Sequence, residues 1–295
     1  MKFRSPLRYP GGKSKLTPFI KALISKAGLK DATYVEPFAG GAGVAVSLLM
    51  DGTVSQIVIN DLDKAVYSFW RAVKTESKAL IKMIADTHIT IEEREKQLAI
   101  YQNEKRYSVE LAFATLFLNR VNRSGIITGG PIGGYEQSGH WKLDARFNKG
   151  AIIERITDIA NKKNAVAVYN QDVIAFIDKI LPKYADSAFV YFDPPYYNKA
   201  KRLYKNALSH DDHARIARRI LGCVDCHWLL TYDDVPEIRA LYAGKSIKCF
   251  DLNYSVANKG KASEIIVCSD NSLLDSFAGQ SSVGAAFNLR NCEVI

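Results

Sequence analysis

The chain has 295 residues, of which 47% are hydrophobic and 24% are charged, a composition ordinary for a soluble globular protein of one or two domains. It has no apolar run of about 18 residues, which excludes a transmembrane helix, and its basic N-terminus lacks the apolar core of a secretory signal. The net charge of +9 favours a polyanionic partner, because phosphate contacts supply most non-specific affinity for nucleic acids. We therefore expect a cytoplasmic protein without membrane contact.

Seven runs of β-forming residues occur along the chain, and helix-like segments separate most of them. The runs are residues 33–36, 56–60, 165–169, 188–192, 227–231, 247–251 and 264–268. This alternation predicts an α/β fold with a doubly wound, mostly parallel, seven-stranded sheet. The last two runs have no helix between them. We expect them to form an antiparallel edge hairpin, whose polar loop carries Lys259 and Lys261 as candidates for gripping a phosphate backbone.

A long segment separates the second and third strands. About a hundred residues lie there, many more than a crossover helix requires. Its first part is charged and helical in pattern, and the part at 119–149 is rich in Gly, Asn and Arg. We expect an inserted, mainly helical domain at 75–159, a main domain made of 1–74 and 160–270, and a loose tail at 271–295.

A glycine-rich turn follows the first strand and leads into an apolar, helix-like run at 44–50. Glycines there let the backbone approach a ligand closely, and a helix N-terminus favours an anionic group. Asp61 ends the second strand, where an acidic residue can accept hydrogen bonds from ribose hydroxyls. Its alternative role is the N-cap of a helix over 64–73. The turn and Asp61 are therefore candidates for one ligand site.

Two further segments are candidates for the same site. The stretch Tyr9–Ser14 is not a phosphate loop, because that motif needs a glycine at the position of Leu7 and a preceding strand. A tight loop that contacts a cofactor carboxylate fits it better. The third strand runs into Asp172, which can accept from an adenine amino group or cap the next helix.

The tetrapeptide Asp193-Pro194-Pro195-Tyr196 follows the apolar run at 188–192. Two prolines must end that strand, and Asp193 is held extended because it precedes a proline. In open α/β sheets, ligands bind at the carboxyl ends of strands. A carboxylate, rigid carbonyls and an aromatic face at this edge suit a planar base with an exocyclic amine. The alternative is a strand-ending turn with a capping Asp.

A helix start is predicted after Ser209. Ser209 suits the N-cap and Asp212 lies three residues later, with acidic residues in the first turn. This interpretation is favoured over a metal site built from His210, Asp211, Asp212 and His213. The five cysteines, at 223, 226, 249, 268 and 292, include one CxxC pair, but no second pair or histidine cluster completes a zinc site. We expect reduced, structural thiols and no metal.

Taken together, these segments resemble the D12 (Dam-type, or α) class of DNA adenine-N6 methyltransferases. The matching stretches are RYPGGKSKL at the start, VEPFAGGAG after the first strand, ND at the second and DPPYY after the fourth. The insertion's Leu118-Asn119-Arg120 and the pair Phe147-Asn148 are also similar. The likeness extends over about residues 4–268 and implies a Rossmann-like class I methyltransferase fold.

The resemblance implies roles for these segments. S-adenosylmethionine is the implied cofactor, bound by Tyr9, Pro10, Gly11, Gly12, Lys13, Glu36, Pro37, Phe38, Ala39, Gly40, Gly41, Gly43, Asp61 and Asp172. The implied catalytic residues are Asp193, Pro194, Pro195 and Tyr196. The insertion becomes a target-recognition domain for double-stranded DNA, and a restriction nuclease or defence system is a possible functional partner. Residues with the chemistry for DNA contacts are Asn119, Arg120, Asn122, Arg123, Arg146, Asn148, Lys259 and Lys261.

Two departures from the family pattern matter. Ala42 stands where the usual FxGxG loop has its second glycine, and Gly43 follows one position later. The segment NRVNRSGI differs from the NRYGYNGL of GATC-specific members, because Val121 and Arg123 replace tyrosines that wedge into the duplex. GATC specificity is therefore not expected.

The motif implies a mechanism without metal or covalent intermediate. Adenine's amino nitrogen is a poor nucleophile because its lone pair is delocalised into the ring. Asp193 and the Pro194 carbonyl can accept both of its N–H groups and so localise the lone pair, by positioning and electrostatics. Tyr196 can stack on the base once it is extruded from the duplex.

Four alternative functions can each be compared with one feature of the sequence. An RNA adenine methyltransferase faces the same chemistry, but the large insertion favours duplex DNA. In enzymes that methylate cytosine N4, a Ser or Asn usually replaces the first Asp. A catalytically silent DNA-binding regulator on this scaffold is disfavoured by the intact DPPY. A nucleotide hydrolase is disfavoured because the phosphate loop is missing.

Overall fold

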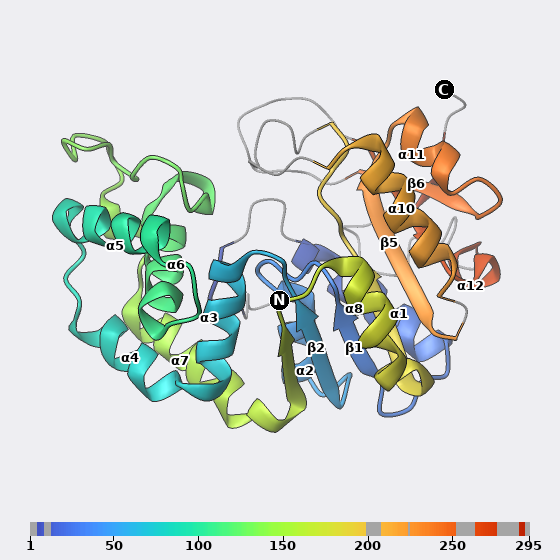
Figure 1. The fold of residues 1–295 in the computed structure, drawn as a ribbon, viewed down its shortest axis with the longest axis horizontal. Coiled ribbons are helices and arrows are strands. Elements are labelled where there is room, and N and C mark those ends of the chain that lie inside the picture. Colours follow the sequence, from blue (N-terminus) through green and yellow to red (C-terminus); the bar gives the residue numbers. More distant parts are fainter. Residues whose placement is uncertain are drawn as a thin grey trace. The chain divides into compact units, whose positions relative to one another are not determined.

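Eight strands form one mixed sheet in the part of the chain that this computed structural model describes (Figure 1). The described residues are 5–8, 13–198, 208–223, 225–251, 263–275 and 289–292. The strands are β1 (Thr33–Glu36), β2 (Gln56–Asn60), β3 (Val166–Tyr169), β4 (Ala188–Phe192), β5 (His227–Asp233), β6 (Ile247–Asp251), β7 (Ser263–Cys268) and β8 (Arg290–Asn291). Their order across the sheet is β3-β2-β1-β4-β5-β7-β6-β8. The predicted α/β fold with a mostly parallel sheet is confirmed.

Helices separate most of the parallel strands. They are α1 (Thr17–Lys26), α2 (Gly43–Met50), α3 (Lys64–Thr75), α4 (Ser77–Asp86), α5 (Ile91–Asn103), α6 (Val109–Val121), α7 (Lys149–Asn161), α8 (Val173–Lys179), α10 (His210–Leu221), α11 (Pro236–Leu241) and α12 (Asn271–Asp275). Short 3-10 turns are η1 (Lys13–Leu16), η2 (Arg123–Gly125), η3 (Leu143–Arg146), η4 (Lys163–Ala165) and η5 (Leu181–Ser187). Within the described ranges, no helix has both the length and the apolar character needed to cross a membrane.

The strand order changes direction between β1 and β4. These strands are neighbours and pair in parallel, with Val35 opposite Val190, although β2 and β3 come between them in the chain. On its other side, β4 pairs in parallel with β5. Every residue of β4 is buried, which explains its uninterrupted apolar sequence. Ligands of open α/β sheets bind at the carboxyl ends of strands at such a switch point, and here these ends carry Glu36 and Asp193.

The far edge of the sheet is antiparallel. Strand β7 pairs antiparallel with both β5 and β6, so the predicted hairpin is confirmed. An eighth strand, β8, was not predicted; its Asn291 pairs with Lys248 of β6. The expectation of a loose tail at 271–295 is therefore wrong where the tail is described, since it contains α12 and β8. A two-residue strand is too short to show a period.

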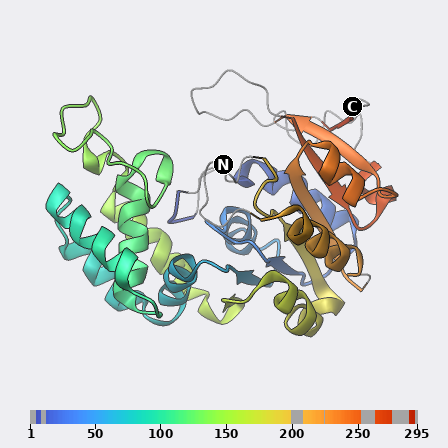
Figure 2. The same ribbon diagram turned by 45° about the horizontal axis from the view of Figure 1, so that its top comes forward.

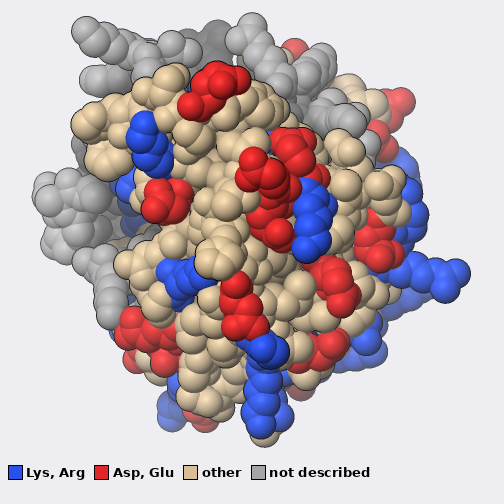
Figure 3. Space-filling view, turned by 90° about the vertical axis from the view of Figure 1, so that its left-hand side faces the viewer, with Lys and Arg blue, Asp and Glu red and all other residues tan. Residues whose placement is uncertain are grey.

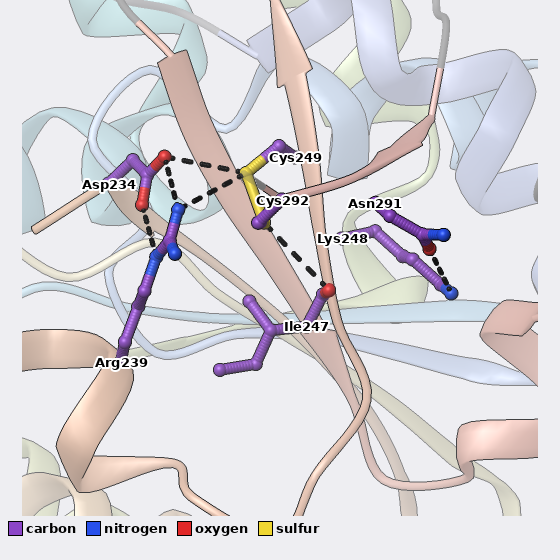
Figure 4. Close-up of a disulfide and its surroundings, with 7 residues drawn as sticks. All are labelled: Asp234, Arg239, Ile247, Lys248, Cys249, Asn291 and Cys292. Carbon is purple, nitrogen blue, oxygen red and sulfur yellow. Dashed lines mark hydrogen bonds and ion pairs between the residues drawn. A yellow bond between two sulfur atoms is a disulfide. The ribbon is translucent and has the colours of Figure 1, made fainter. Parts of the chain in front are cut away.

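A disulfide joins Cys249 of β6 to Cys292, next to β8 (Figure 4). The expectation of reduced thiols is wrong for this pair, which lies 43 residues apart in the chain. The bidentate ion pair of Arg239 with Asp234 lies beside it, with Arg239 Nε 2.7 Å from the carboxylate (Figure 4). The three free cysteines are Cys223, Cys226 and Cys268.

The chain divides into two compact units. Unit 1 comprises residues 1–14, 39–51 and 58–171, and unit 2 comprises 15–38, 52–57 and 172–295. Within unit 1, helices α4 to α7 gather into one group in both ribbon views (Figures 1 and 2). Helix α6 is buried at every position from 111 to 121 and packs against α3 and α5, which makes it the centre of this group. The recognition role and the bounds of the 75–159 insertion stay predictions.

Candidate active site

The Asp193–Tyr196 motif directly follows β4 in unit 2. The strand ends at Phe192 because the two prolines of the motif cannot donate to a neighbouring strand. Pro194 is buried, whereas Asp193 and Tyr196 are half-buried. The carboxyl end of a central strand thus carries a carboxylate, two proline carbonyls and an aromatic ring.

A chain of hydrogen bonds orients the Asp193 carboxylate. Thr231 of β5 donates from Oγ1 to Oδ1 of Asp193 at 2.8 Å, and Tyr191 Oη lies 2.8 Å from the same Oγ1. A threonine hydroxyl has one proton, which here goes to Asp193, so Tyr191 donates to Thr231. Burial, followed by the charge of Asp193, raises the pKa of Tyr191 well above its ordinary value, so the phenol keeps that proton. The Asp193 carboxylate is therefore a hydrogen-bond acceptor whose orientation is fixed by Thr231 and Tyr191.

A second carboxylate, Glu36, ends β1 in the same unit and is 4% exposed. Burial raises the pKa of Tyr34 well above its ordinary value, and the charges of Glu36 and, to a smaller extent, Asp193 raise it further. The ends of β1 and β4 therefore form a region of negative potential at the switch point.

The segment that follows the motif is tied to β5 as well. The two carboxylate oxygens of Asp233 accept the backbone N–H groups of Tyr197 and Asn198, each at 2.9 Å. The ring of Tyr196 lies 6.4 Å from that of Tyr232, tilted by 32°. Strand β5 therefore contacts the motif at its first residue and just past its last.

Helix α10 begins as predicted. Ser209 is its N-cap and forms a capping box with Asp212. His213 is buried and its Nδ1 lies 2.5 Å from Tyr232 Oη, while burial lowers its pKa. The histidine is thus a neutral packing residue at ordinary pH. Among the residues that the structure describes, no group of three or more His, Cys, Asp or Glu side chains could hold a metal ion.

The glycine-rich turn in unit 1 is closed by Asp61. Gly40 has a φ of +45°, a left-handed conformation that suits glycine, and its N–H donates to Oδ2 of Asp61 at 2.8 Å. The other oxygen of Asp61 accepts from the N–H of Asp63 at 2.9 Å. Trp70 Nε1 donates to the carbonyl of Gly40 at 2.8 Å. The structure therefore brings together two of the predicted cofactor residues.

Asp61 does not cap a helix. Asp63 is the N-cap of α3 and accepts from the N–H of Ala65 at 2.8 Å, so the capping alternative for Asp61 is wrong by two residues. Burial raises the pKa of Asp61 to about 6, although the hydrogen bonds from Gly40 and Asp63 oppose the shift. Its carboxylate therefore titrates close to physiological pH.

The rest of the turn is packed closely. Ser5 Oγ donates to the carbonyl of Gly41 at 2.5 Å, and a Cβ on Gly43 would meet Ser14 Oγ at 2.4 Å. Ala42, which replaces the family's second glycine, is left-handed with a φ of 42° and precedes α2. The other predicted residues of the turn are buried or half-buried: Pro37, Phe38 and Ala39.

The remaining predicted cofactor residues are less informative. Asp172 is exposed and caps α8 by accepting from the N–H of Ile174 at 2.9 Å, so its capping alternative is confirmed. Lys13 is buried at the start of η1. The residues Tyr9, Pro10, Gly11 and Gly12 lie outside the described part of the chain.

A model of the D12 class N6 adenine-specific DNA methyltransferase family matches residues 9–256. The chain belongs to this family. M.MjaIII of Methanocaldococcus jannaschii, a type II methyltransferase, is 25% identical, over 74% of this chain and 79% of that protein. M1.LlaDCHI of Lactococcus lactis subsp. cremoris, also a type II methyltransferase, is 24% identical, over 88% and 93%. Among solved structures, the rRNA methyltransferase aviRa of Streptomyces viridochromogenes has a TM-score of 0.40 and 16% identity, over 91% of this chain and 89% of that chain.

As a D12 methyltransferase, the chain acts on DNA, and its insertion holds most of the predicted DNA-binding residues. Asn119 of α6 is 1% exposed. Its Oδ1 accepts from the N–H of Arg8 at 2.7 Å, and its Nδ2 donates to the carbonyls of Arg8 and Gly125 at 2.6 and 2.8 Å. In this structure the side chain joins the N-terminal segment to the loop after α6.

Arg120 and Asn122, the next two predicted DNA-binding residues, also form hydrogen bonds within the protein. Arg120 donates from Nε to the carbonyl of Pro6 at 2.7 Å, and burial lowers its pKa to about 9. Asn122 accepts from Arg94 Nε at 2.8 Å and donates to the carbonyl of Ile127 at 2.7 Å. Both side chains are buried. Contact of these residues with DNA stays a prediction. Their hydrogen bonds to other parts of the protein were not predicted from the sequence.

Other predicted DNA-binding residues of the D12 insertion are exposed. Arg123 and Arg146 reach the surface, and Asn148 is exposed while its Oδ1 caps α7 by accepting from the N–H of Ala151 at 3.0 Å. Lys259 and Lys261 lie outside the described residues. On the face shown in Figure 3, basic and acidic side chains are interspersed, so the net charge of +9 is not gathered there.

The site also contains residues that the sequence did not single out. Thr231 and Asp233 lie two positions apart on β5 and contact Asp193 and the backbone just past Tyr196, respectively. The sequence does contain a signal for them, because HWLLTYD becomes polar at the carboxyl end of a strand, where open α/β sheets bind their ligands. The pairing of β5 with β4, which makes that signal specific, is visible only in the fold.

Proposed function

We propose that this D12 enzyme transfers the methyl group of S-adenosylmethionine to N6 of an adenine extruded from double-stranded DNA, with Asp193, Pro194, Pro195 and Tyr196 as its catalytic residues. The observation that carries the proposal is the oriented carboxylate of Asp193 at the carboxyl end of β4, where the strand order changes direction. At this position, the fold class binds its ligands.

The residues at the motif suit an aromatic amine. Asp193 accepts one N–H of the adenine amino group and the carbonyl of Pro194 accepts the other, which returns the lone pair from the ring to the nitrogen. The preorganised carboxylate needs little rearrangement, because Thr231 already holds it. Tyr196 supplies a face on which an extruded base stacks. A charged carboxylate also stabilises the positive charge that develops on the nitrogen as its new bond forms.

The turn and Asp61 fit the cofactor. S-adenosylmethionine supplies an electrophilic methyl group on a positively charged sulfur. Asp61 offers a half-buried acceptor for ribose hydroxyls, next to a turn that Gly40 allows to run close to a ligand. The negative potential set up by Glu36 and Asp193 at the ends of β1 and β4 favours a cationic group. We therefore assign the Glu36–Gly43 turn and Asp61 to the cofactor.

We assign DNA contact to the loop between α6 and α7. Tyr135 and Trp141 are 59% and 63% exposed there, although large aromatic side chains are normally buried. The loop is braced: Gln137 donates from Nε2 to two backbone carbonyls, at 2.8 and 2.6 Å, and its Oε1 accepts from the N–H of Leu143 at 2.8 Å. A rigid loop that exposes aromatic rings suits the stacking of unpaired bases.

A pocket of about 470 Å³ opens on this loop. It is lined by Arg123, Ile132, Gly133, Gly134, Ser138, Gly139, His140 and Trp141. The guanidinium of Arg146 lies 5.9 Å from the Trp141 ring, which adds positive charge beside the aromatic surface. Cationic and aromatic groups together favour a nucleic-acid ligand.

The proposed function is tested by the chemical identity of the product. Unmethylated duplex DNA and a matched RNA are incubated with the enzyme and labelled S-adenosylmethionine, and the digested nucleosides are separated by mass spectrometry. The expected product is N6-methyladenine from DNA alone. Label in RNA, or in N4-methylcytosine, would contradict the proposal.

The relatives' names, type II methyltransferases, further support a role in protecting DNA from a partner nuclease. We propose that this enzyme marks the cleavage sites of such a nuclease. Methylation-sensitive sequencing of DNA from cells that express the enzyme gives its recognition sequence. DNA carrying that modification is expected to resist the restriction enzyme that cuts the same sequence, and unhindered cleavage would contradict this role.

A further inference from the structure

We infer that strand β5 is a positioning element for the catalytic motif, acting through Thr231 at the first residue of the motif and through Asp233 just past its last. This inference rests on the proposed function, because it assigns to these two residues the task of aligning Asp193 and its backbone for adenine. Neither residue needs to touch the substrate.

The geometry of the sheet places both residues on the motif. Residues two apart on a strand point to the same face, so Thr231 and Asp233 act from one side of β5. Strand β5 runs parallel to β4 with Leu230 opposite Phe192, which brings the residue after Leu230 next to the residue after Phe192. These are Thr231 and Asp193, the pair joined at 2.8 Å.

Thr231 controls the direction in which the Asp193 carboxylate faces. It is fully buried, and its hydroxyl has no solvent to replace either partner. With Tyr191 donating to it, the hydroxyl can only donate onward to Asp193. A hydrogen bond donated to a carboxylate favours its ionised form, so this chain also keeps Asp193 a hydrogen-bond acceptor.

Asp233 controls the backbone at the other end. It is 5% exposed, and its two oxygens accept two consecutive backbone N–H groups, those of Tyr197 and Asn198. A buried carboxylate is costly unless donors surround it, and here those donors are the main chain that leaves the motif. The three residues between Asp193 and Tyr197 are Pro194, Pro195 and Tyr196, which supply the proposed carbonyl acceptor and the stacking ring. Hydrogen bonds from Thr231 at one end and to Asp233 at the other therefore fix the positions of these residues.

Thr231→Val and Thr231→Ser form a matched pair that tests the first attachment. Valine has the shape of threonine without the hydroxyl, and serine keeps the hydroxyl. We expect Thr231→Val to lower kcat about 10- to 100-fold, the range for a lost hydrogen bond to a charged group, and Thr231→Ser to stay within about threefold of the wild type. Calorimetric affinity for S-adenosylmethionine is expected to stay unchanged in both.

Rescue by the conservative variant separates positioning from mere loss of stability. Serine keeps the donor that valine removes, so Thr231→Ser is expected to retain kcat whereas Thr231→Val loses it, independently of the unfolding midpoint of each variant in denaturant. A Thr231→Val enzyme with the wild-type kcat, or a Thr231→Ser enzyme as impaired as Thr231→Val, would overturn the role of Thr231.

Asp233→Asn tests the second attachment independently, because an amide can accept only through its single oxygen. We expect kcat to fall at unchanged affinity for the cofactor, and a wild-type kcat would overturn this half of the inference. All variants are assayed on the same unmethylated duplex DNA as the wild type. If the wild type forms no N6-methyladenine, the proposed function fails, whereas an active wild type with unaffected variants removes only the inference about β5.

Discussion

The protonation state of Asp61, which closes the glycine-rich turn, changes close to physiological pH. Its oxygens are held by the N–H groups of Gly40 and Asp63, yet burial raises its pKa to about 6. Above that pH the ionised group accepts hydrogen bonds, and below it one oxygen carries a proton and loses acceptor capacity. The proposed ribose contact is therefore present at neutral pH and weakened in mild acid.

Cofactor affinity is expected to report this titration. The dissociation constant for S-adenosylmethionine should rise as pH falls from 7 to 5, with a midpoint near the pKa of about 6. Asp61→Asn should bind more weakly at pH 7 and lose the midpoint, because it has no titrating group. Calorimetry across this range gives both quantities. A wild-type affinity that is flat between pH 5 and 7 would contradict the assignment of Asp61.

The role of a single residue could be predicted from the sequence where its neighbours in the chain determine that role. It could not be predicted where contacts with distant parts of the chain determine it. Ser209 is recognisable as an N-cap from its neighbours alone. Asp61 and Asp63 both follow a strand, and only the position of Gly40 shows which one closes the turn. Asn119 and Arg120 have the chemistry of DNA contacts, but their internal partners, Arg8 and Pro6, lie more than a hundred residues away in the chain.

At the scale of elements, the loop after α6 is held by close backbone packing. Gly125 has a φ of +76°, and a Cβ there would lie 2.3 Å from the carbonyl oxygen of Arg8. Asn119 bonds to both of these residues, so the N-terminal segment, the end of α6 and the loop form one packed unit. The loop's conformation therefore depends on a position where only glycine fits.

Gly125→Ala is expected to destabilise the fold by about 1–3 kcal/mol, because it combines a strained φ with a clash against backbone. Gly130→Ala is the matched control: it lies in the same loop, and a Cβ there meets nothing within 4 Å. Its effect should stay within about 0.5 kcal/mol. Denaturant unfolding measures both variants, and equal stabilities would contradict this packing.

Trp141 gives the corresponding prediction for DNA binding by the loop. Trp141→Ala is expected to weaken binding to duplex DNA by about tenfold or more, the scale of one stacked base. Trp141→Phe keeps an aromatic face and should lose less. Leu62→Ala removes an equally exposed apolar side chain (66%) outside the loop and should change nothing. Fluorescence anisotropy with labelled DNA ranks the three, and a Trp141→Ala affinity equal to that of Leu62→Ala would contradict the assignment.

At the scale of the whole molecule, the order of the strands could be anticipated only in part. The apolar runs located all seven longer strands, because each consists largely of β-forming, apolar residues bounded by polar segments. The eighth strand and the disulfide could not be anticipated, since Cys249 and Cys292 are brought together by the pairing of β6 with β8. Neither a two-residue strand nor a pair of distant cysteines leaves a local signal.

The disulfide is expected to stabilise the oxidised protein by about 2–4 kcal/mol, because it closes a 43-residue loop in the unfolded chain. Cys292→Ser should therefore unfold at lower denaturant than the wild type under oxidising conditions and match it under reducing conditions. Alkylation of the denatured but unreduced wild type should label three cysteines, Cys223, Cys226 and Cys268. Five labelled cysteines in protein that was never reduced would contradict the disulfide.

The central claim is that Asp193, at the carboxyl end of β4, accepts the amino group of the target adenine. Its most direct test is the rate of methyl transfer to duplex DNA by Asp193→Ala, measured together with calorimetric binding of S-adenosylmethionine. The account predicts that transfer is lost and that cofactor affinity stays close to that of the wild type, because Asp61 and the glycine turn are untouched. Undiminished transfer by Asp193→Ala would contradict it.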